Sequence, residues 1–234
     1  MKSRYLFYTF FDRLKAIEKS VFANVSINAH MSDMIKKLLV ATNNPGKLFE
    51  LRELFDGLPV ALQSLSNLDA FTEVEETGTT FVENACLKAS GYAIQTGLPA
   101  IADDSGLEVA ALGGRPGVLS ARYGGRGTSF AEKMTLLLAE IEETGGSNRE
   151  ARFVCSIAIA DADGIILHTT EGICPGKIAA APGGNGGFGY DPLFVPDGFD
   201  LTFGELSSAI KGEISHRSRA FEQIKPFLRD FIAI

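Results

Sequence analysis

Short apolar runs that each end in a polar motif constrain the fold of this chain most. The motifs occupy residues 41–47 (ATNNPGK), 75–78 (EETG), 102–106 (ADDSG), 188–192 (FGYDP) and 215–217 (SHR). Chemistry in proteins is usually carried by loops that a rigid scaffold positions. Because polar motifs of this kind add little to packing, the set predicts one functional site assembled from distant parts of the chain.

The hydrophobic spacing predicts an α/β fold, or an α+β fold, with a mixed sheet and helices around it, because strands and helices do not alternate strictly. The helix predicted at 79–95 has Thr79 or Thr80 as its cap and Gly97 after its end. A hairpin is expected around residues 161–164. Strands are predicted at 37–41, 98–102, 152–160 and 164–174, and helices at 47–55, 79–95, 130–143 and about 218–232.

The 234 residues, of which 45% are hydrophobic, suffice for one full core, and no Pro/Ser-rich linker divides them. We therefore expect a single domain at 34–234 after an N-terminal extension, 1–33. The extension mixes basic and aromatic residues, and Asp12 and Glu18 argue against a secretory signal. An organelle-targeting segment and an over-extended start, with Met31 or Met34 as the true first residue, both stay open.

Charge and cysteine content exclude several classes of protein. The net charge of −7 disfavours a nucleic-acid binder, which usually carries a basic face. No apolar run reaches the roughly 18 residues of a membrane span. The three cysteines lack CxxC spacing, which indicates buried thiols in a reducing compartment rather than disulfides or a zinc site. A cytoplasmic protein is expected.

Residues 42–47 follow an apolar run and precede a helical pattern. Thr42, Asn43, Asn44 and Lys47 offer hydroxyl, amide and ammonium groups suited to phosphate oxygens, and a helix start offers backbone N–H groups. The motif is not a Walker A loop, because Leu48 stands where Ser or Thr is required. An ordinary strand-to-helix turn with a surface lysine is the alternative.

Two acidic pairs indicate a cation site. Asp103 and Asp104 follow an apolar run, and because neighbours in an extended segment point to opposite sides, only one should face the site. A magnesium ion shared with substrate phosphates would compensate such a carboxylate. Glu75 and Glu76 form the second pair, and Lys88 lies one turn beyond Asn84, so that both can face one anion. Helix capping and a solvated turn are the alternative roles.

The glycine-rich segment 184–189 matches G-x-G-x-x-G, but the proline at 192 argues against the helix that a dinucleotide fold requires. We expect it instead to present Phe188, a stacking surface for a base, and Asp191. Lys211, His216 and Arg217 complete the set as donors suited to a purine edge. For His216 a helix-capping role is the alternative.

Together the motifs T-N-N-P-G-K, E-E-T-G-x-T-F-x-E-N-A, A-D-D-S-G-L, L-S-A-R-Y, F-G-Y-D-P and S-H-R resemble those of the inosine/xanthosine triphosphate pyrophosphatases, from about Lys37 to the C-terminus. The resemblance implies an α/β fold with a mixed central sheet, flanking helices and two lobes around an active-site cleft. It also implies a homodimer, a Mg²⁺ requirement, and hydrolysis of non-standard purine triphosphates between the α- and β-phosphates.

The resemblance also assigns roles to matching positions. It implies Asp104 as the proton acceptor and a metal ligand, with Glu75 as a second metal ligand. The residues it places on the substrate are Thr42, Asn43, Asn44, Pro45, Gly46, Lys47, Lys88, Ser105, Phe188, Gly189, Tyr190, Asp191, Lys211, His216 and Arg217.

Selectivity between purine nucleotides is expected to come from hydrogen bonds to the edge of the base. Donors from His216 or Arg217 would accept a 6-oxo purine and reject adenine, and a backbone N–H near C2 would repel the 2-amino group of guanine. Two other functions stay open: a broader triphosphate diphosphatase acting on damaged pyrimidines, and a nucleotide-binding sensor without catalysis.

Overall fold

The computed structural model describes residues 36–68 and 70–233, so the extension 1–33 lies outside the described part. Its centre is a six-stranded mixed sheet in the order β2-β1-β3-β4-β5-β6. β1 pairs in parallel with β2 and with β3, and the remaining pairs are antiparallel. The strands are β1 (Lys36–Val40), β2 (Val60–Ser64), β3 (Ala100–Val109), β4 (Glu150–Ala160), β5 (Ile166–Ile178) and β6 (Phe194–Pro196).

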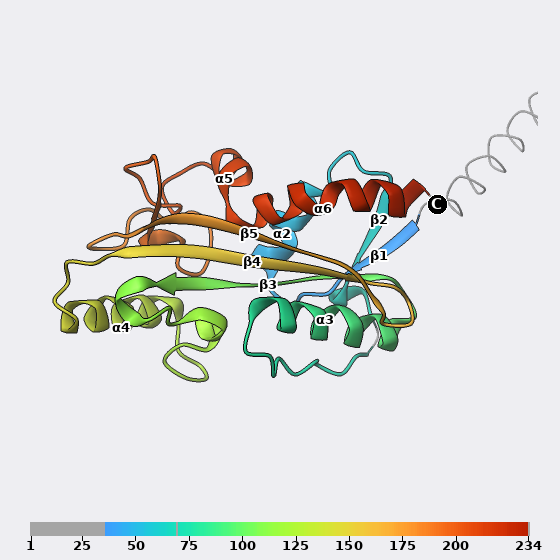
Figure 1. Ribbon diagram of the computed structural model, residues 1–234, viewed down its shortest axis with the longest axis horizontal. Coiled ribbons are helices and arrows are strands. Elements are labelled where there is room, and N and C mark those ends of the chain that lie inside the picture. The colour runs from blue at the N-terminus through green and yellow to red at the C-terminus, as the bar shows by residue number, and fades with distance from the viewer. Residues whose placement is uncertain (1–35, 69, 234) are drawn as a thin grey trace, which may run out of the picture.

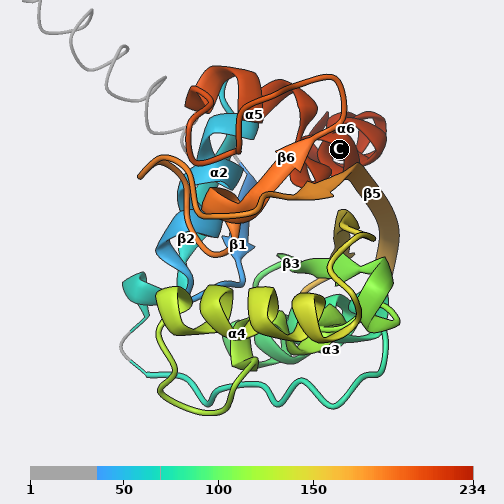
Figure 2. The same cartoon turned by 90° about the vertical axis from the view of Figure 1, so that its left-hand side faces the viewer.

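Helices cover both faces of the sheet. In Figure 1, α5 and α6 lie above the long strands, and α3 and α4 lie below them; Figure 2 shows α2 on the same side as α5. The same two layers separate in the view of Figure 2. This confirms the predicted α/β fold with a mixed sheet. The helices are α2 (Pro45–Leu54), α3 (Phe81–Thr96), α4 (Phe130–Glu143), α5 (Ser208–Ile214) and α6 (His216–Ala233).

The buried side chains form three hydrophobic clusters rather than one. One cluster joins α2 and α6 to the sheet, and a second joins the alanine face of α3 to the opposite side. The third surrounds Leu137, Phe153 and Phe194, where α4 and β6 meet the far ends of β3, β4 and β5. The long antiparallel strands therefore link two packed regions, and the site described below lies along β3 between them.

α3 has the strongest local signals of the helices. Thr80 caps it and forms a reciprocal capping box with Glu83, and Gly97 ends it in a left-handed conformation with φ of 64°. Its small buried residues let the helix approach the sheet closely. That approach carries Asn84 and Lys88, on the same face, to the carboxylate of Asp104.

The predicted strand at 98–102 was too short. β3 continues to Val109, so Asp103 and Asp104 lie within the strand, opposite Ile157 and Ser156 of β4, rather than after its end. The strand can contain two carboxylates because cations meet them on both faces. The hairpin of β4 and β5 and the helix at 130–143 are confirmed.

Among the strands and α-helices of the described residues, three short ones were not predicted: β2, β6 and α5. β6 has three residues and α5 has seven, too few to show a periodicity. Among the described residues, no helix combines the length and the apolar character that crossing a membrane requires.

Candidate active site

Asp103 is the fixed anion of the site. Its buried carboxylate accepts hydrogen bonds from Arg217 Nε at 3.1 Å and Nη2 at 2.8 Å, and Lys47 Nζ lies 3.3 Å away. Burial alone would raise the pKa of Asp103, but Lys47, Arg217 and Lys88 hold it well below its ordinary value. Asp103 therefore stays ionised and joins α2 and α6 to the sheet.

Asp104 faces the other side of the sheet and is held by α3. Its carboxylate lies 3.0 Å from Lys88 Nζ and accepts a hydrogen bond from Asn84 Nδ2 at 3.3 Å. Burial raises the pKa of Asp104, although Lys88 and Lys47 pull it down. An acid with a raised pKa is suited to accepting a proton. The two neighbouring carboxylates thus point to opposite faces of β3, as expected for an extended segment.

Of the second acidic pair, Glu76 and not Glu75 reaches this cluster. Glu76 lies 3.3 Å from Lys88 Nζ, which thus bridges it to Asp104. The side chain of Glu75 is exposed. The geometry therefore favours Glu76 as the partner of Asp104, where Glu75 was expected.

Within the motif at 42–47, side chains accept hydrogen bonds from several of the motif's own backbone N–H groups. Asn44 Oδ1 accepts hydrogen bonds from the N–H groups of Gly46 and Lys47, and the hydroxyl of Thr42 accepts one from Asn44. Asn44 thus caps α2, and the amides expected to hold a phosphate are already bonded. Side chains remain for that role: Asn43 is exposed, and Lys47 is partly exposed beside Asp103.

Phe188 and Asp191 form one end of the site with Lys211, as predicted. Asp191 accepts hydrogen bonds from the Phe188 N–H at 2.7 Å and from Lys211 Nζ, and Lys211 lies 4.7 Å above the Phe188 ring centroid. Gly46 lets the ring approach, because a Cβ there would lie 2.5 Å from it. No helix opens from residues 184–189, so the rejected dinucleotide site is absent from the described fold.

Arg217 makes more hydrogen bonds and ion pairs within the protein than expected. Beyond Asp103, its guanidinium binds the Ser105 hydroxyl at 2.9 Å and the carboxylate of Glu50. These partners occupy the donors that were expected to read a purine. The structure therefore leaves His216 as the better candidate for the base edge.

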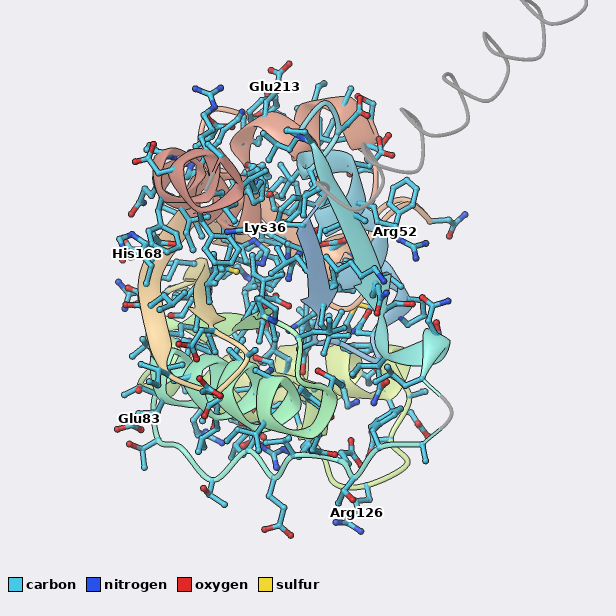
Figure 3. The ribbon with its side chains drawn as sticks, turned by 90° about the vertical axis from the view of Figure 1, so that its right-hand side faces the viewer. Lys36, Arg52, Glu83, Arg126, His168 and Glu213 are labelled. Carbon is cyan, nitrogen blue, oxygen red and sulfur yellow. The ribbon has the colours of Figure 1, made fainter. Side chains whose placement is uncertain are left out.

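His216 lies in the first turn of α6 and stacks on Phe153, with ring centroids 4.7 Å apart. The alternative capping role belongs to Ser215, whose hydroxyl accepts the Ser218 N–H. Burial, and then the charges of Arg217 and Lys211, hold the pKa of His216 well below its ordinary value. The ring is therefore neutral, and its Nδ1 is buried without a partner among the described residues. The remaining histidine in that part of the chain, His168, lies at the periphery, stacked on Phe227 (Figure 3).

A cavity of about 60 Å³ joins the predicted phosphate and base residues, which is room for only a few water molecules. A wider cavity of about 590 Å³ lies beside it and shares Phe188 and Lys211 with it. We take the smaller one as the base end of the site, because ten of the fifteen expected substrate-binding residues line it; Asp104 and Lys88 are not part of its lining. Its lining is Asn44, Lys47, Ser105, Gly106, Ser120, Ala121, Phe130, Phe153, Phe188, Gly189, Tyr190, Asp191, Lys211, His216 and Arg217.

The sheet is open beside this cavity. β1 pairs with β3 only as far as Val40 and Ile101, after which the chain of β1 turns into the 42–47 motif. Beyond Ile101, β1 therefore no longer pairs with this edge of β3, where Ala102 is followed by Asp103, Asp104 and Ser105.

Sequence reasoning missed two contributors. Glu50 lies one turn after Lys47 on α2 and pairs with Lys211 at 2.7 Å as well as with Arg217. The spacing of Lys47 and Glu50 on one helical face was the available signal. Ser120, whose carbonyl accepts a hydrogen bond from the Tyr190 hydroxyl, had no signal because its role depends on a tertiary contact.

The carboxylates near Lys88 fit a Mg²⁺ ion whose remaining ligands are substrate phosphates and waters. Among the described residues, no group of three His, Cys, Asp or Glu side chains could hold a metal ion by itself. Magnesium is usually bound by one or two carboxylates together with substrate phosphates and waters. Asp104 and Glu76, both in contact with Lys88, supply that number.

Comparison with known proteins agrees with this geometry. Residues 38–227 match the model of the Ham1 family. Over 199 residues the chain is 47% identical to the dITP/XTP pyrophosphatase of Mycobacterium tuberculosis (strain ATCC 25618 / H37Rv), covering 84% of this chain and 97% of that protein. It is 50% identical over 195 residues to the Nostoc enzyme of the same name, covering 82% and 94%.

A solved HAM1 protein from Coxiella burnetii superposes with a TM-score of 0.77 at 40% identity, covering 84% of this chain and 100% of that one. The Ham1 protein of Staphylococcus aureus gives 0.74 at 39% identity, with the same coverage. Sequence and structure agree over the whole region that holds the site. The chain belongs to the Ham1 family.

Proposed function

We propose that this protein is a Mg²⁺-dependent pyrophosphatase that hydrolyses ITP, dITP and XTP to the nucleoside monophosphate and pyrophosphate. Relatives in the family are named dITP/XTP pyrophosphatases, which supports hydrolysis of non-standard nucleoside triphosphates. The observation that carries the proposal is Asp104: a buried carboxylate with a raised pKa, beside Lys88 and at the open edge of β3.

In this proposal the nucleotide lies across the open edge of β3. The base enters the cavity with Phe188 and His216, which must widen to accept a purine, and the phosphates pass between Lys47 on one face and Lys88 on the other. The two lysines offset the charge of the triphosphate. Phosphoryl transfer asks mainly for such positioning and charge neutralisation.

Asp104 orients the attacking water and takes its proton, while pyrophosphate leaves. Its raised pKa makes it a better acceptor than an exposed aspartate, and Asn84 fixes the orientation of the carboxylate. Asp104 and Glu76 would hold Mg²⁺, which when bound supplies further charge neutralisation on the phosphate oxygens.

Selectivity against adenine follows from a donor at the 6-position. A neutral His216 is the candidate if its tautomer places the proton on the ring nitrogen that faces the base, since Arg217 is held by carboxylates. A 6-oxo group accepts such a donor, whereas a 6-amino group leaves two donors facing each other.

Two further expectations rest on the family resemblance. We propose a homodimer, which light scattering tests directly, and a cytoplasmic location. The free cysteines Cys86, Cys155 and Cys174 support a reducing compartment.

Pyrophosphate release from ITP, dITP, XTP, GTP, ATP and dTTP with Mg²⁺ tests the function. Fast release from the first three, and little from GTP and ATP, supports it. Fast release from dTTP alone would point to a broader diphosphatase. Binding without release from any nucleotide would indicate a sensor and overturn the proposal.

A further inference from the structure

Lys133 is a buried lysine that the proposed reaction leaves without a role. It lies on α4 with 5% of its surface exposed, and the described salt bridges include none to it. Its Nζ donates a hydrogen bond of 2.8 Å to the carbonyl of Ala121 and lies 4.4 Å from the Phe130 ring centroid. Ala121 and Phe130 both line the site cavity. The buried ammonium group of Lys133 therefore contacts two residues that line the cavity.

The neighbouring carbonyl is engaged in the same way. The Ser120 carbonyl accepts a hydrogen bond of 3.1 Å from the hydroxyl of Tyr190, itself a lining residue with 3% exposure. The Ser120 hydroxyl accepts the Leu107 N–H at 2.9 Å and donates to the Gly117 carbonyl at 2.6 Å. These bonds hold the segment 117–121, which forms this wall of the cavity, against β3.

Close packing holds this wall in place as well. A Cβ on Gly106 would lie 2.4 Å from the Gly117 carbonyl oxygen, so only glycine permits the segment after Ser105 to approach so closely. The wall cannot turn its carbonyls elsewhere without losing these contacts. Its acceptors are therefore presented in one fixed arrangement.

A third acceptor of the cavity is also engaged. Oδ2 of the Asp191 carboxylate accepts hydrogen bonds from the Phe188 N–H and from Lys211 Nζ. Asp191, Ser120 and Ala121 thus each have a donor supplied by the protein. An amino group at C2 can be disfavoured without the backbone N–H expected there, because these nearby acceptors already accept a hydrogen bond from the protein.

We infer that Lys133 and Tyr190 set selectivity against amino-substituted purines by occupying the carbonyls of Ala121 and Ser120. This inference rests on the proposed function, because the base must enter this cavity. An exocyclic amino group brought against the wall would have to share a carbonyl oxygen that already accepts a hydrogen bond from the protein, whereas the hydrogen at C2 of hypoxanthine needs no partner. GTP differs from ITP only by such a 2-amino group, so the pair tests the idea directly.

The test compares kcat/KM for GTP and ITP in matched variants. Lys133→Met keeps the length of the side chain and frees the Ala121 carbonyl, so the ratio of GTP to ITP should rise about tenfold, the usual effect of pairing a buried donor. Lys133→Arg restores a donor and should keep the wild-type ratio. Lys225→Met, which removes a surface lysine bonded to Glu222, is the control.

Tyr190→Phe gives a second, independent measurement, because it frees the Ser120 carbonyl and should also raise the ratio. It carries the test if Lys133→Met does not fold, as judged by circular dichroism. Folded variants that lose activity toward GTP and ITP in equal proportion would overturn the inference.

Calorimetric binding of IMP and GMP separates the two proposals. If the wild type releases no pyrophosphate but prefers IMP, and Lys133→Met loses that preference, the catalytic function fails and the inference stands. Pyrophosphate release with an unchanged nucleotide preference in both variants leaves the function standing and removes the inference. Equal binding of IMP and GMP by the wild type also overturns it.

Discussion

Asp103 and Asp104 are adjacent in β3, yet their carboxylates lie on opposite faces of the sheet and contact different lysines. Lys47 lies 3.3 Å from Asp103, and Lys88 lies 3.0 Å from Asp104. Two cations, Lys47 and Arg217, keep the pKa of Asp103 low despite its burial, whereas burial dominates at Asp104 and raises its pKa. The pair therefore divides into a structural carboxylate and a reactive one.

Replacing Asp104 with Asn should lower kcat for ITP by at least about 10²-fold, the usual contribution of general-base catalysis. The amide keeps the shape but cannot take a proton. Steady-state pyrophosphate release measures the effect, with circular dichroism as the check on folding. Near-normal turnover in this variant would remove Asp104 from its role.

Replacing Asp103 with Asn should act on stability instead. It leaves the buried charges of Arg217 and Lys47 without their shared counterion, and breaking a buried pair lowers the free energy of unfolding by about 3–5 kcal/mol. Urea denaturation measures that quantity. Glu108→Gln is the control, because its exposed pair with Arg152 should contribute less than about 1 kcal/mol. Equal losses in both variants would contradict the structural role of Asp103.

Much of the fold follows from local patterns in the sequence. The helix α3 is defined by its cap at Thr80 and its end at Gly97, and the β4–β5 hairpin by the turn at 161–164, so both could be predicted. The true length of β3 could not, because acidic residues seldom continue a buried strand. Only the cations brought by α2, α3 and α6 make that strand stable, and they are distant in sequence.

The candidate site shows the same limit. The sequence identified many of the residues that line the cavity, but not how they are paired. Arg217 was expected to read a base and instead holds Asp103 and Glu50. Asn44 was expected to hold a phosphate and also caps α2. Such pairings depend on the distances between elements, which no spacing along the chain reveals.

Glu75 and Glu76 can be told apart by their effect on magnesium. Glu76 lies beside Lys88 and Asp104, whereas Glu75 is exposed. Glu76→Gln should therefore raise the Mg²⁺ concentration for half-maximal activity by about tenfold, the lower end of the usual loss on disturbing a metal site. Glu75→Gln should change it little. A larger effect of Glu75→Gln would restore the assignment that the family resemblance implies.

The buried ring of His216 should make stability depend on pH. Its pKa is held well below the ordinary 6.5 by burial and by the charges of Arg217 and Lys211. In the window between the lowered pKa and 6.5, the unfolded chain binds a proton that the native protein does not. The free energy of unfolding therefore falls as the pH drops below about 6.5, by up to about 1.4 kcal/mol per pH unit.

His216→Phe keeps the stacking on Phe153 and removes the titrating ring. Urea denaturation of variant and wild type between about pH 7.5 and about pH 5.5 should therefore show a stability difference that shifts in favour of the variant as the pH falls. The other titrating groups are common to both proteins and cancel in that difference. His168→Phe, at the edge of β5, serves as the control for removal of a peripheral histidine. Parallel curves for His216→Phe and the wild type would show that His216 binds its proton equally well in both states.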